Sequence, residues 1–160
     1  MKLGIEIGGT KLQLGVGDGN SAQVVQLVRE PINPEAGASG ILAQIQRASG
    51  PLIQQHGIDH IGIGFGGPVD TAAGRAITSH QVDGWNGFRL AEWCRDTLGR
   101  PATIGNDCDV AALAEAHLGA GQGQRTVFYV TVGTGIGGGF VQDGRLLGIG
   151  RPAAAEIGHL

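Results

Sequence analysis

The chain of 160 residues is long enough for one large domain or two small ones, and its hydrophobic content of 41% allows a buried core. A net charge of −3, an aromatic content of 4% and the lack of a Lys/Arg cluster exclude the usual signature of a nucleic-acid partner. Two cysteines without metal or redox spacing, and no apolar run near the roughly 18 residues of a membrane span, predict a cytoplasmic protein that binds a small molecule and no membrane.

The first part of the chain predicts an antiparallel meander followed by a helix. Short apolar runs at 3–7, 12–16 and 23–28 are separated by glycine-containing turns and therefore predict strands. Apolar residues then recur at helical spacing over 41–53. We expect Gly50-Pro51 to break or restart this helix, because proline lacks the N–H that the helix interior needs.

The middle of the chain predicts strands that alternate with helices. In chain order the elements are a buried strand at 60–65, a glycine bend at 66–70, a polar and turn-rich stretch at 71–88, a helix at 90–98 that ends at Gly99, a strand at 101–104 and an alanine-rich helix at 108–118. A glycine- and glutamine-rich linker at 119–124 then predicts the boundary between a first domain, 1–118, and a second, 119–160.

The stretch VTVGTGIGGGFVQDG, residues 130–144, contains GTGIGG and so matches the dinucleotide-binding pattern G-x-G-x-x-G. That pattern needs a strand before it and a helix after it. Here the strand at 129–132 is followed by an apolar run and by Asp143-Gly144, a dipeptide typical of hairpin turns. We therefore predict a glycine-lined bend inside a β-hairpin, whose backbone N–H groups can approach an anion.

The start of the chain follows the same plan. IEIGGTKLQLGVGDG, residues 5–19, aligns without a gap to residues 130–144, and both consist of strand, glycine bend, strand and Asp-Gly turn. Two related domains, each opening with a phosphate-facing hairpin, would explain this similarity. Chance similarity between two glycine-rich hairpins is the alternative.

The first hairpin carries a candidate phosphate and metal site. Glu6 lies at the end of the first strand, beside Gly8, Gly9, Thr10 and Lys11. A carboxylate next to N–H groups, a hydroxyl and an ammonium can hold hydrated Mg²⁺ and the phosphates that it bridges. The alternative is a surface hairpin with a solvated lysine, and the second glycine hairpin favours the functional interpretation.

Asn106 and Asp107 lie between a predicted strand and the start of a predicted helix. Both residue types cap helices, which is the simplest explanation for them. The functional alternative is a carboxylate at the carboxyl end of a strand, where open α/β sheets bind ligands and where it can accept a hydroxyl proton. Asp109 competes for this role, but it lies further inside the helix.

Glu156 and His159 are three residues apart, so they share one face if this segment is helical. They make half of a metal site, but zinc needs further ligands and no cysteine follows residue 108. A pair of groups that bind sugar hydroxyls is the other functional interpretation.

The segments EIGGTK, GFGGPVD, GNDCDVAALAE and VTVGTGIGGGFVQDG, followed by EIGH, together resemble the ROK family of sugar kinases. Their order and spacing are specific, and the resemblance spans this whole chain but only the N-terminal half of a typical member. It implies an α/β fold of the actin-like ATPase (ribonuclease H-like) class, with a mixed sheet, flanking helices and the start of a second similar domain. It also implies transfer of the γ-phosphate of ATP to a hydroxyl of a hexose such as glucose.

The resemblance assigns a role to each candidate residue. Asp107 would be the general base that takes the proton of the attacking sugar hydroxyl. The sugar would bind, beside Asp107, to Gly66, Gly67, Ser79, His80, Asn106, Glu156 and His159. ATP phosphates and Mg²⁺ would lie against Glu6, Gly8, Gly9, Thr10 and Lys11, opposite Gly133, Thr134, Gly135 and Gly137. Backbone cradles and a metal suit phosphoryl transfer because its main demands are charge neutralisation and alignment.

Two features depart from the family pattern. Glu6 stands where the family motif has Asp, so that the carboxylate is carried on one additional methylene. The chain ends at Leu160, before the cysteines that bind structural Zn²⁺ together with the histidine in family members and before their adenosine pocket. Zinc at His159 is therefore expected only in a longer chain.

The resemblance implies that this chain is the sugar-binding and catalytic-base half of a kinase that is a homodimer at full length. Alone, it is expected to bind ATP poorly and to be unstable or pair with another segment, because the strands at 126–141 keep open edges. A sugar-sensing regulatory module, as in repressors of the same family, is the alternative. The chain keeps an aspartate that a pure sensor does not need.

Overall fold

The computed structural model of the protein describes residues 1–132 and 136–147. Its largest sheet consists of β1 (Lys2–Ile7), β2 (Lys11–Gly17), β3 (Val24–Pro31), β4 (His60–Phe65) and β7 (Ala102–Asn106). The spatial order is β3-β2-β1-β4-β7. Neighbouring strands among β3, β2 and β1 are antiparallel, whereas β1, β4 and β7 are parallel, so the predicted meander and the predicted mixed sheet are both confirmed.

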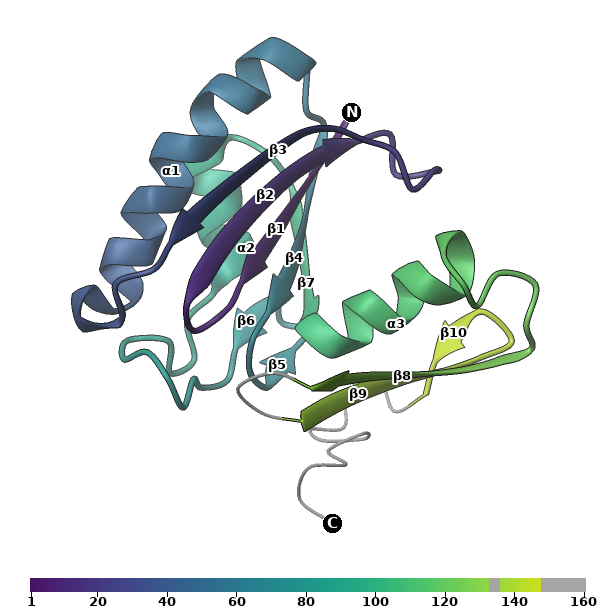
Figure 1. The fold of residues 1–160 in the computed structure, drawn as a ribbon. Helices are drawn as coiled ribbons and strands as arrows, with labels where there is room; N and C mark the ends of the chain where they lie inside the picture. Colours follow the sequence, from purple (N-terminus) through teal and green to yellow (C-terminus); the bar gives the residue numbers. More distant parts are fainter. Residues whose placement is uncertain (133–135, 148–160) are drawn as a thin grey trace.

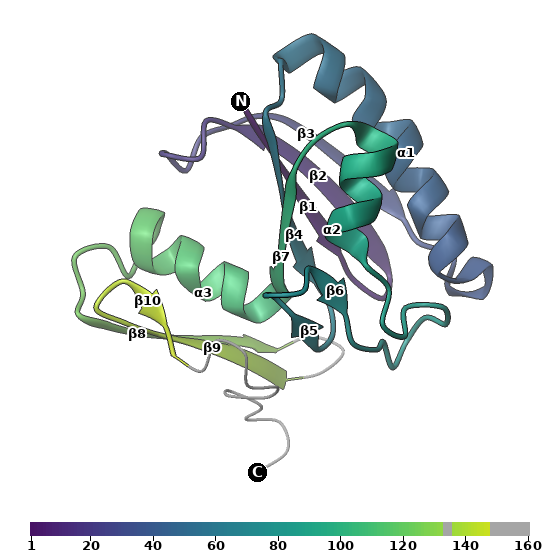
Figure 2. The same cartoon turned by 180° about the vertical axis from the view of Figure 1, so that it is seen from behind.

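Helices α1 (Gly37–His56) and α2 (Leu90–Trp93) cover one face of this sheet (Figures 1 and 2). The packing follows from the alternation in β1, where Leu3, Ile5 and Ile7 point into the core and are at most 2% exposed. The residues between them, including Glu6, lie on the opposite face. On β1 and β2 that opposite face carries the polar side chains Glu6 and Gln13.

Helix α1 runs unbroken through Gly50-Pro51, so the predicted break is wrong. Pro51 removes one N–H from the helix, but it lies on the exposed side, where water can hydrate the freed carbonyl. Ile45 and Leu52, on either side of this point, are both buried, and this continuous apolar face holds the helix together. Gly57 ends it in the left-handed conformation, with φ 59°.

The predicted helix at 90–98 is confirmed, with a change of form along its length. After α2 the chain continues as a π-helical turn, Cys94–Leu98, and ends at Gly99 with φ 66°, as predicted. The remaining short elements of the first lobe are the 3-10 turn η1 (Pro34–Ala36) and the two-stranded ribbon of β5 (Val69–Asp70) and β6 (Arg75–Ala76).

Helix α3 (Asp107–Leu118) begins directly after β7 and packs against a second, three-stranded sheet. This sheet is made of β8 (Thr126–Val132), β9 (Ile136–Gln142) and β10 (Arg145–Leu146), in the order β10-β9-β8. Glycine in β9 allows the helix to approach: a Cβ on Gly139 would stand 2.5 Å from the Cβ of Ala112. The division at residue 118 stays a prediction.

The second glycine-rich motif forms a β-hairpin, as predicted, because β8 and β9 pair in antiparallel fashion. Asp143 and Gly144 have φ angles of 50° and 75°, as their turn between β9 and β10 requires. The strand bounds of this hairpin match those of β1 and β2 at the aligned positions. The register differs by one residue, because Ile7 pairs with Leu12 whereas Val132 pairs with Ile136.

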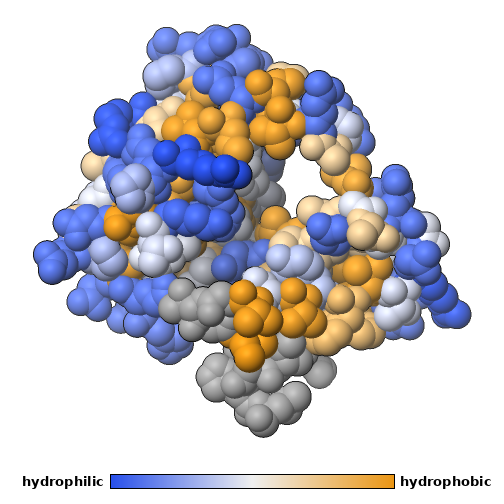
Figure 3. Space-filling view, viewed as in Figure 1, coloured by the Kyte–Doolittle hydropathy of each residue, from blue (hydrophilic) through white to orange (hydrophobic). Residues whose placement is uncertain are grey.

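Within residues 1–132 and 136–147, no helix combines the length and apolarity needed to cross a bilayer. Apolar side chains nevertheless reach the surface of the second sheet (Figure 3). The exposed ones on β8 and at the start of β9 are Phe128, Val130, Val132 and Ile136.

Candidate active site

Two glycine bends meet where the parallel strands β1 and β4 end. Gly66 N donates to Ile7 O at 2.8 Å, and a Cβ on Gly66 would stand 3.5 Å from the Cα of Gly8. The first bend is closed by Gly8 N, which donates to Lys11 O at 3.1 Å. The bends predicted to face phosphate and sugar therefore lie side by side, at the strand ends where open α/β sheets bind ligands.

Asp107 lies beside these bends because β7 is the next parallel strand and α3 starts immediately after it. A Cβ on Gly66 would be 3.5 Å from Asp107 Oδ2, and a Cβ on Gly64 would be 3.6 Å from Asp107 Cα. A Cβ on Gly66 would be in van der Waals contact with the carboxyl group, so the glycine leaves that space above the bend open. A small polar ligand that lies on the Gly66 bend can reach this carboxylate.

Burial raises the pKa of Asp107, and the nearby charge of Glu6 raises it further. Hydrogen bonds from the backbone N of Cys108, at 2.9 Å, and from the Cys108 thiol act in the opposite direction. Asp109 also has a raised pKa, because of burial first and the charge of Asp107 second. A carboxylate with a raised pKa is a stronger proton acceptor than an ordinary aspartate.

Asn106 performs two structural tasks. Its Oδ1 caps α3 by accepting from the backbone N of Cys108 at 3.0 Å and of Asp109 at 3.3 Å. Its Nδ2 donates to Gly67 O at 3.2 Å and so ties the second bend to the start of α3. The capping interpretation is confirmed, and contact with a sugar stays a prediction.

Glu6 and Lys11 face the first bend from β1 and β2. Lys11 Nζ lies 3.4 Å from Glu6 Oε1, and Gln13 Nε2 donates to Glu6 Oε2. Among the residues that the structure describes, no group of three or more metal-ligating side chains occurs. Mg²⁺ commonly takes one or two carboxylates and completes its shell with phosphate oxygens and water, so the Glu6 carboxylate fits such an ion.

The loop that carries Ser79 and His80 is fixed to the core by Trp85, which is 1% exposed. Ser79 Oγ accepts from the backbone N of Gln81 at 3.3 Å and of Val82 at 3.2 Å, so the hydroxyl shapes the loop. The His80 side chain is exposed. The structure brings this loop to the first bend.

Three residues near the site escaped the sequence analysis. The Gln81 side chain lies against the first bend, since a Cβ on Gly9 would overlap Gln81 Oε1 at 1.4 Å. Gln13 contacts Glu6, and Cys108 contacts Asp107. Of the three, only Gln13 could have been noticed from the sequence, because it lies on the polar face of a predicted strand.

Several predicted residues lie outside the described residues: Gly133, Thr134, Gly135, Glu156 and His159. Gly137 is described, and a Cβ there would stand 2.7 Å from the Sγ of Cys108, the residue after Asp107. Strand β9 therefore passes beside the start of α3.

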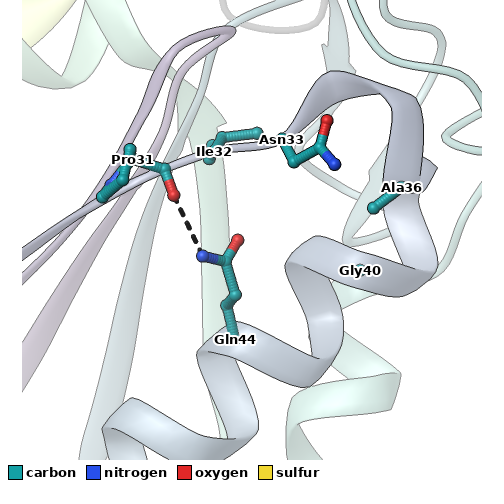
Figure 4. A pocket seen from close by; sticks show the side chains of 6 residues that line it. All are labelled: Pro31, Ile32, Asn33, Ala36, Gly40 and Gln44. Carbon is teal, nitrogen blue, oxygen red and sulfur yellow. Dashed lines mark hydrogen bonds between the residues drawn. The ribbon is translucent and has the colours of Figure 1, made fainter.

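A hollow of about 350 Å³ lies between the end of β3 and α1 (Figure 4). Its lining consists of Pro31, Ile32, Asn33, Ala36, Gly40 and Gln44. Gln44 Nε2 donates to Pro31 O at 3.0 Å along its wall. None of its lining residues can act as an acid or base, so the candidate active site is the region around Asp107 instead.

A mixed sheet with flanking helices, whose parallel strands end at glycine bends and carboxylates, defines a protein of the actin-like ATPase class. The chain belongs to the ROK family, whose family model matches residues 2–160.

Known proteins agree with this assignment. The glucokinase of Halalkalibacterium halodurans is 32% identical over 162 residues, which cover 99% of this chain and 49% of that protein. The crystal structure of a ROK family glucokinase from Streptomyces griseus in complex with glucose and AMPPNP has a TM-score of 0.89 at 32% identity, over 99% of this chain and 50% of that one.

A ROK family transcriptional regulator, a homolog of the E. coli MLC protein, has a TM-score of 0.84 at 22% identity, over 99% of this chain and 40% of that one. This similarity shows a shared fold alone. The chain spans about half the length of the curated relatives that it matches.

Proposed function

We propose that this chain is the sugar-binding and base-supplying half of an ATP-dependent hexose kinase. The reaction would transfer the γ-phosphate of ATP to a hydroxyl of a hexose such as glucose. The observation that carries the proposal is the position of Asp107, whose carboxyl group faces the Gly66 bend at the edge where β1, β4 and β7 end. Similarity to sugar kinases, including a glucokinase solved with glucose and AMPPNP, supports it.

Asp107 acts in this proposal as the general base. A sugar hydroxyl above Gly66 lies within hydrogen-bond reach of the carboxylate, which takes the hydroxyl proton as the oxygen attacks phosphorus. The raised pKa of Asp107 supports this role because a more basic carboxylate accepts the proton more readily. Asn106, which holds both α3 and Gly67, keeps the base aligned with the bend.

The phosphates would bind to the first bend, residues 8–11, and to the hairpin of β8 and β9. Backbone N–H groups at Gly8, Gly9 and Thr10 would cradle phosphate oxygens, with the Lys11 ammonium beside them. Glu6 would hold Mg²⁺, which would supply charge neutralisation to the phosphates. Gly133, Thr134, Gly135 and Gly137 are proposed to contact the nucleotide from the opposite side.

The remaining sugar contacts are proposed from the family pattern. They would come from Gly67, Ser79, His80, Asn106, Glu156 and His159. The tie from Asn106 to Gly67 and the contact between Gln81 and Gly9 support a shared sugar and phosphate site.

A non-catalytic sugar sensor is the second candidate, because a transcriptional regulator shares the fold. Such a module needs sugar contacts but no general base. The kinase is the better candidate because the Asp107 carboxyl group lies beside the Gly66 bend, as a base for a sugar hydroxyl must, and because similar proteins are sugar kinases.

Calorimetric titration with glucose, N-acetylmannosamine and fructose, with and without Mg-ATP, tests sugar binding by this chain. In a chain continued to the length of its relatives, we expect Asp107→Asn to lower phosphorylation by about 10²- to 10⁴-fold, the usual contribution of a general base. Asp109→Asn is the matched control, and it should retain activity. Sugar binding without phosphorylation by such a chain would favour the sensor.

A further inference from the structure

Three polar side chains form a row across the antiparallel part of the main sheet. Gln13 of β2 lies opposite Glu6 of β1, and Arg29 of β3 lies opposite Gln13. Glu6 and Gln13 alternate with the buried residues of their strands, so the row lies on the face that α1 and α2 leave open. Directly opposed residues are close enough for their side chains to interact.

The hydrogen bonds along this row give the Gln13 amide a single orientation. Arg29 Nε donates to Gln13 Oε1 at 2.6 Å, and Gln13 Nε2 donates to Glu6 Oε2. A guanidinium only donates and a carboxylate only accepts, so a flipped amide would lose both bonds. Each bond has one charged partner, which places both in the stronger class.

The two oxygens of the Glu6 carboxylate thus have different partners, since Lys11 Nζ lies 3.4 Å from Oε1. On the parallel side, Gly64 is opposite Glu6, and a Cβ on Gly64 would stand 3.6 Å from the Cα of Asp107. Gly64 therefore leaves bare backbone between Glu6 and the residue that starts α3. The influence of the Glu6 charge on the pKa of Asp107 agrees with this closeness.

Stability is a poor explanation for this row. Arg29 is exposed and the Glu6 side chain is 41% exposed, and interactions between charged groups in contact with water stabilise a fold only weakly. A glutamate side chain has several freely rotating bonds, so an unheld Glu6 would present its charge in many directions. The row restricts those directions at a position next to the first bend.

We propose that Gln13, oriented by Arg29, is a positioning residue that directs the Glu6 carboxylate toward the space between the Gly8-Gly9 bend and Asp107. The inference rests on the proposed function, in which Mg²⁺ and phosphate occupy that space. It assigns a role to two residues, Gln13 and Arg29, that touch neither sugar nor nucleotide.

The test uses Mg²⁺ with inorganic tripolyphosphate as the probe, because this ligand needs no adenosine pocket. Binding to the 160-residue chain is followed by NMR through the backbone amides of Gly8, Gly9 and Thr10. We expect Gln13→Met to weaken binding about tenfold, in the range for loss of a group that orients a metal ligand. Arg29→Met should weaken it less, and the double variant should bind no more weakly than Gln13→Met.

Gln26→Met is the matched control, since Gln26 lies on β3 and its Oε1 is 2.6 Å from His56 Nε2, outside the row. It should leave binding unchanged. In a Glu6→Gln background, Gln13→Met should have no further effect. Thermal melting of each variant verifies that it is folded.

The outcomes separate this inference from the proposed function. If Glu6→Gln weakens binding and Gln13→Met does not, the positioning role is wrong and the proposed function stands. If Glu6→Gln has no effect, or the unaltered chain does not bind the probe, the proposed role of Glu6 fails and the inference fails with it. The side-chain amide signals of Gln13 give an independent measure: they should shift in Glu6→Gln and Arg29→Met, and unshifted signals would overturn the row.

Discussion

At the residue scale, the carboxyl group of Asp107 costs the folded chain stability. Burial and the Glu6 charge raise its pKa, so the folded chain holds this proton to higher pH than the unfolded chain does. Protonated Asp107 therefore favours the folded chain at pH values below the ordinary aspartate pKa. This contribution to the free energy of unfolding is lost as pH rises through the raised pKa of the folded chain. At pH 7, Asp107→Asn should therefore raise the melting temperature, because it removes the charge that burial disfavours.

Calorimetry at two pH values checks this sign. Asparagine keeps an oxygen for the bond from the Cys108 N–H, so the substitution removes the charge and retains the helix start. The rise in melting temperature should vanish near pH 3, below the usual aspartate pKa of about 3.9. At that pH Asp107 is neutral in both the folded and the unfolded chain. A lower melting temperature for Asp107→Asn at pH 7 would contradict the argument.

Asp107 and the two bends could be proposed from the sequence because motif order and strand ends are local features. Gln13 and Arg29 could not be found in this way, since their pairing depends on the register between three strands. Gln81 depends on a long loop that turns back onto Gly9. Residues that act through tertiary neighbours leave no spacing signal in the chain.

At the element scale, α1 contains a hydroxyl without a partner. Ser49 is 0% exposed, and its Oγ makes no hydrogen bond within the part of the chain that the structure describes. Ser49→Ala removes a desolvated polar group and improves helix propensity, so it should stabilise the fold by about 1 kcal/mol. Urea denaturation measures this, with Ser39→Ala as the control.

Ser39 is a useful comparison because its Oγ donates to Ala36 O at 3.2 Å in the first turn of the same helix. Removal of this hydrogen bond by Ser39→Ala should leave the free energy of unfolding unchanged or lower it slightly. An equal gain from both substitutions would attribute the effect to helix propensity alone.

Close packing between α3 and β9 gives a second prediction at this scale. A Cβ on Gly139 would meet Ala112 Cβ at 2.5 Å and Cys108 O at 2.7 Å, so Gly139→Ala should destabilise the fold by about 1–3 kcal/mol. Gly62→Ala is the control, because a Cβ there meets nothing within 4 Å. Guanidinium unfolding should show Gly62→Ala to be neutral or slightly stabilising, and equal losses would refute this packing argument.

The sequence predicted most helices and strands correctly, but it did not predict that α1 continues through Pro51. Strand alternation and caps such as Gly99 were sufficient for most elements. The helix through Pro51 was not, since its continuity comes from tertiary burial of Ile45 and Leu52. Local propensity is overridden where an apolar face continues on both sides of the break.

At the scale of the whole molecule, the chain spans about half the length of its relatives and exposes apolar side chains on its second sheet. Val132 is 77% exposed and Ile136 50% exposed, and the two pair directly across the β8–β9 hairpin. Water in contact with such a patch favours association, and the net charge of −3 opposes it only weakly. We expect the chain to self-associate at high concentration.

Sedimentation velocity over a range of concentrations measures this association, and Val132→Lys should shift the distribution toward monomer. The lysine places a charge within the patch, where a partner surface would have to desolvate it. Val24→Lys is the matched control, because Val24 is 56% exposed on β3, in the other sheet. If Val24→Lys disperses the chain and Val132→Lys does not, the main sheet is the associating surface. If the unaltered chain stays monomeric throughout, the apolar patch is tolerated in water.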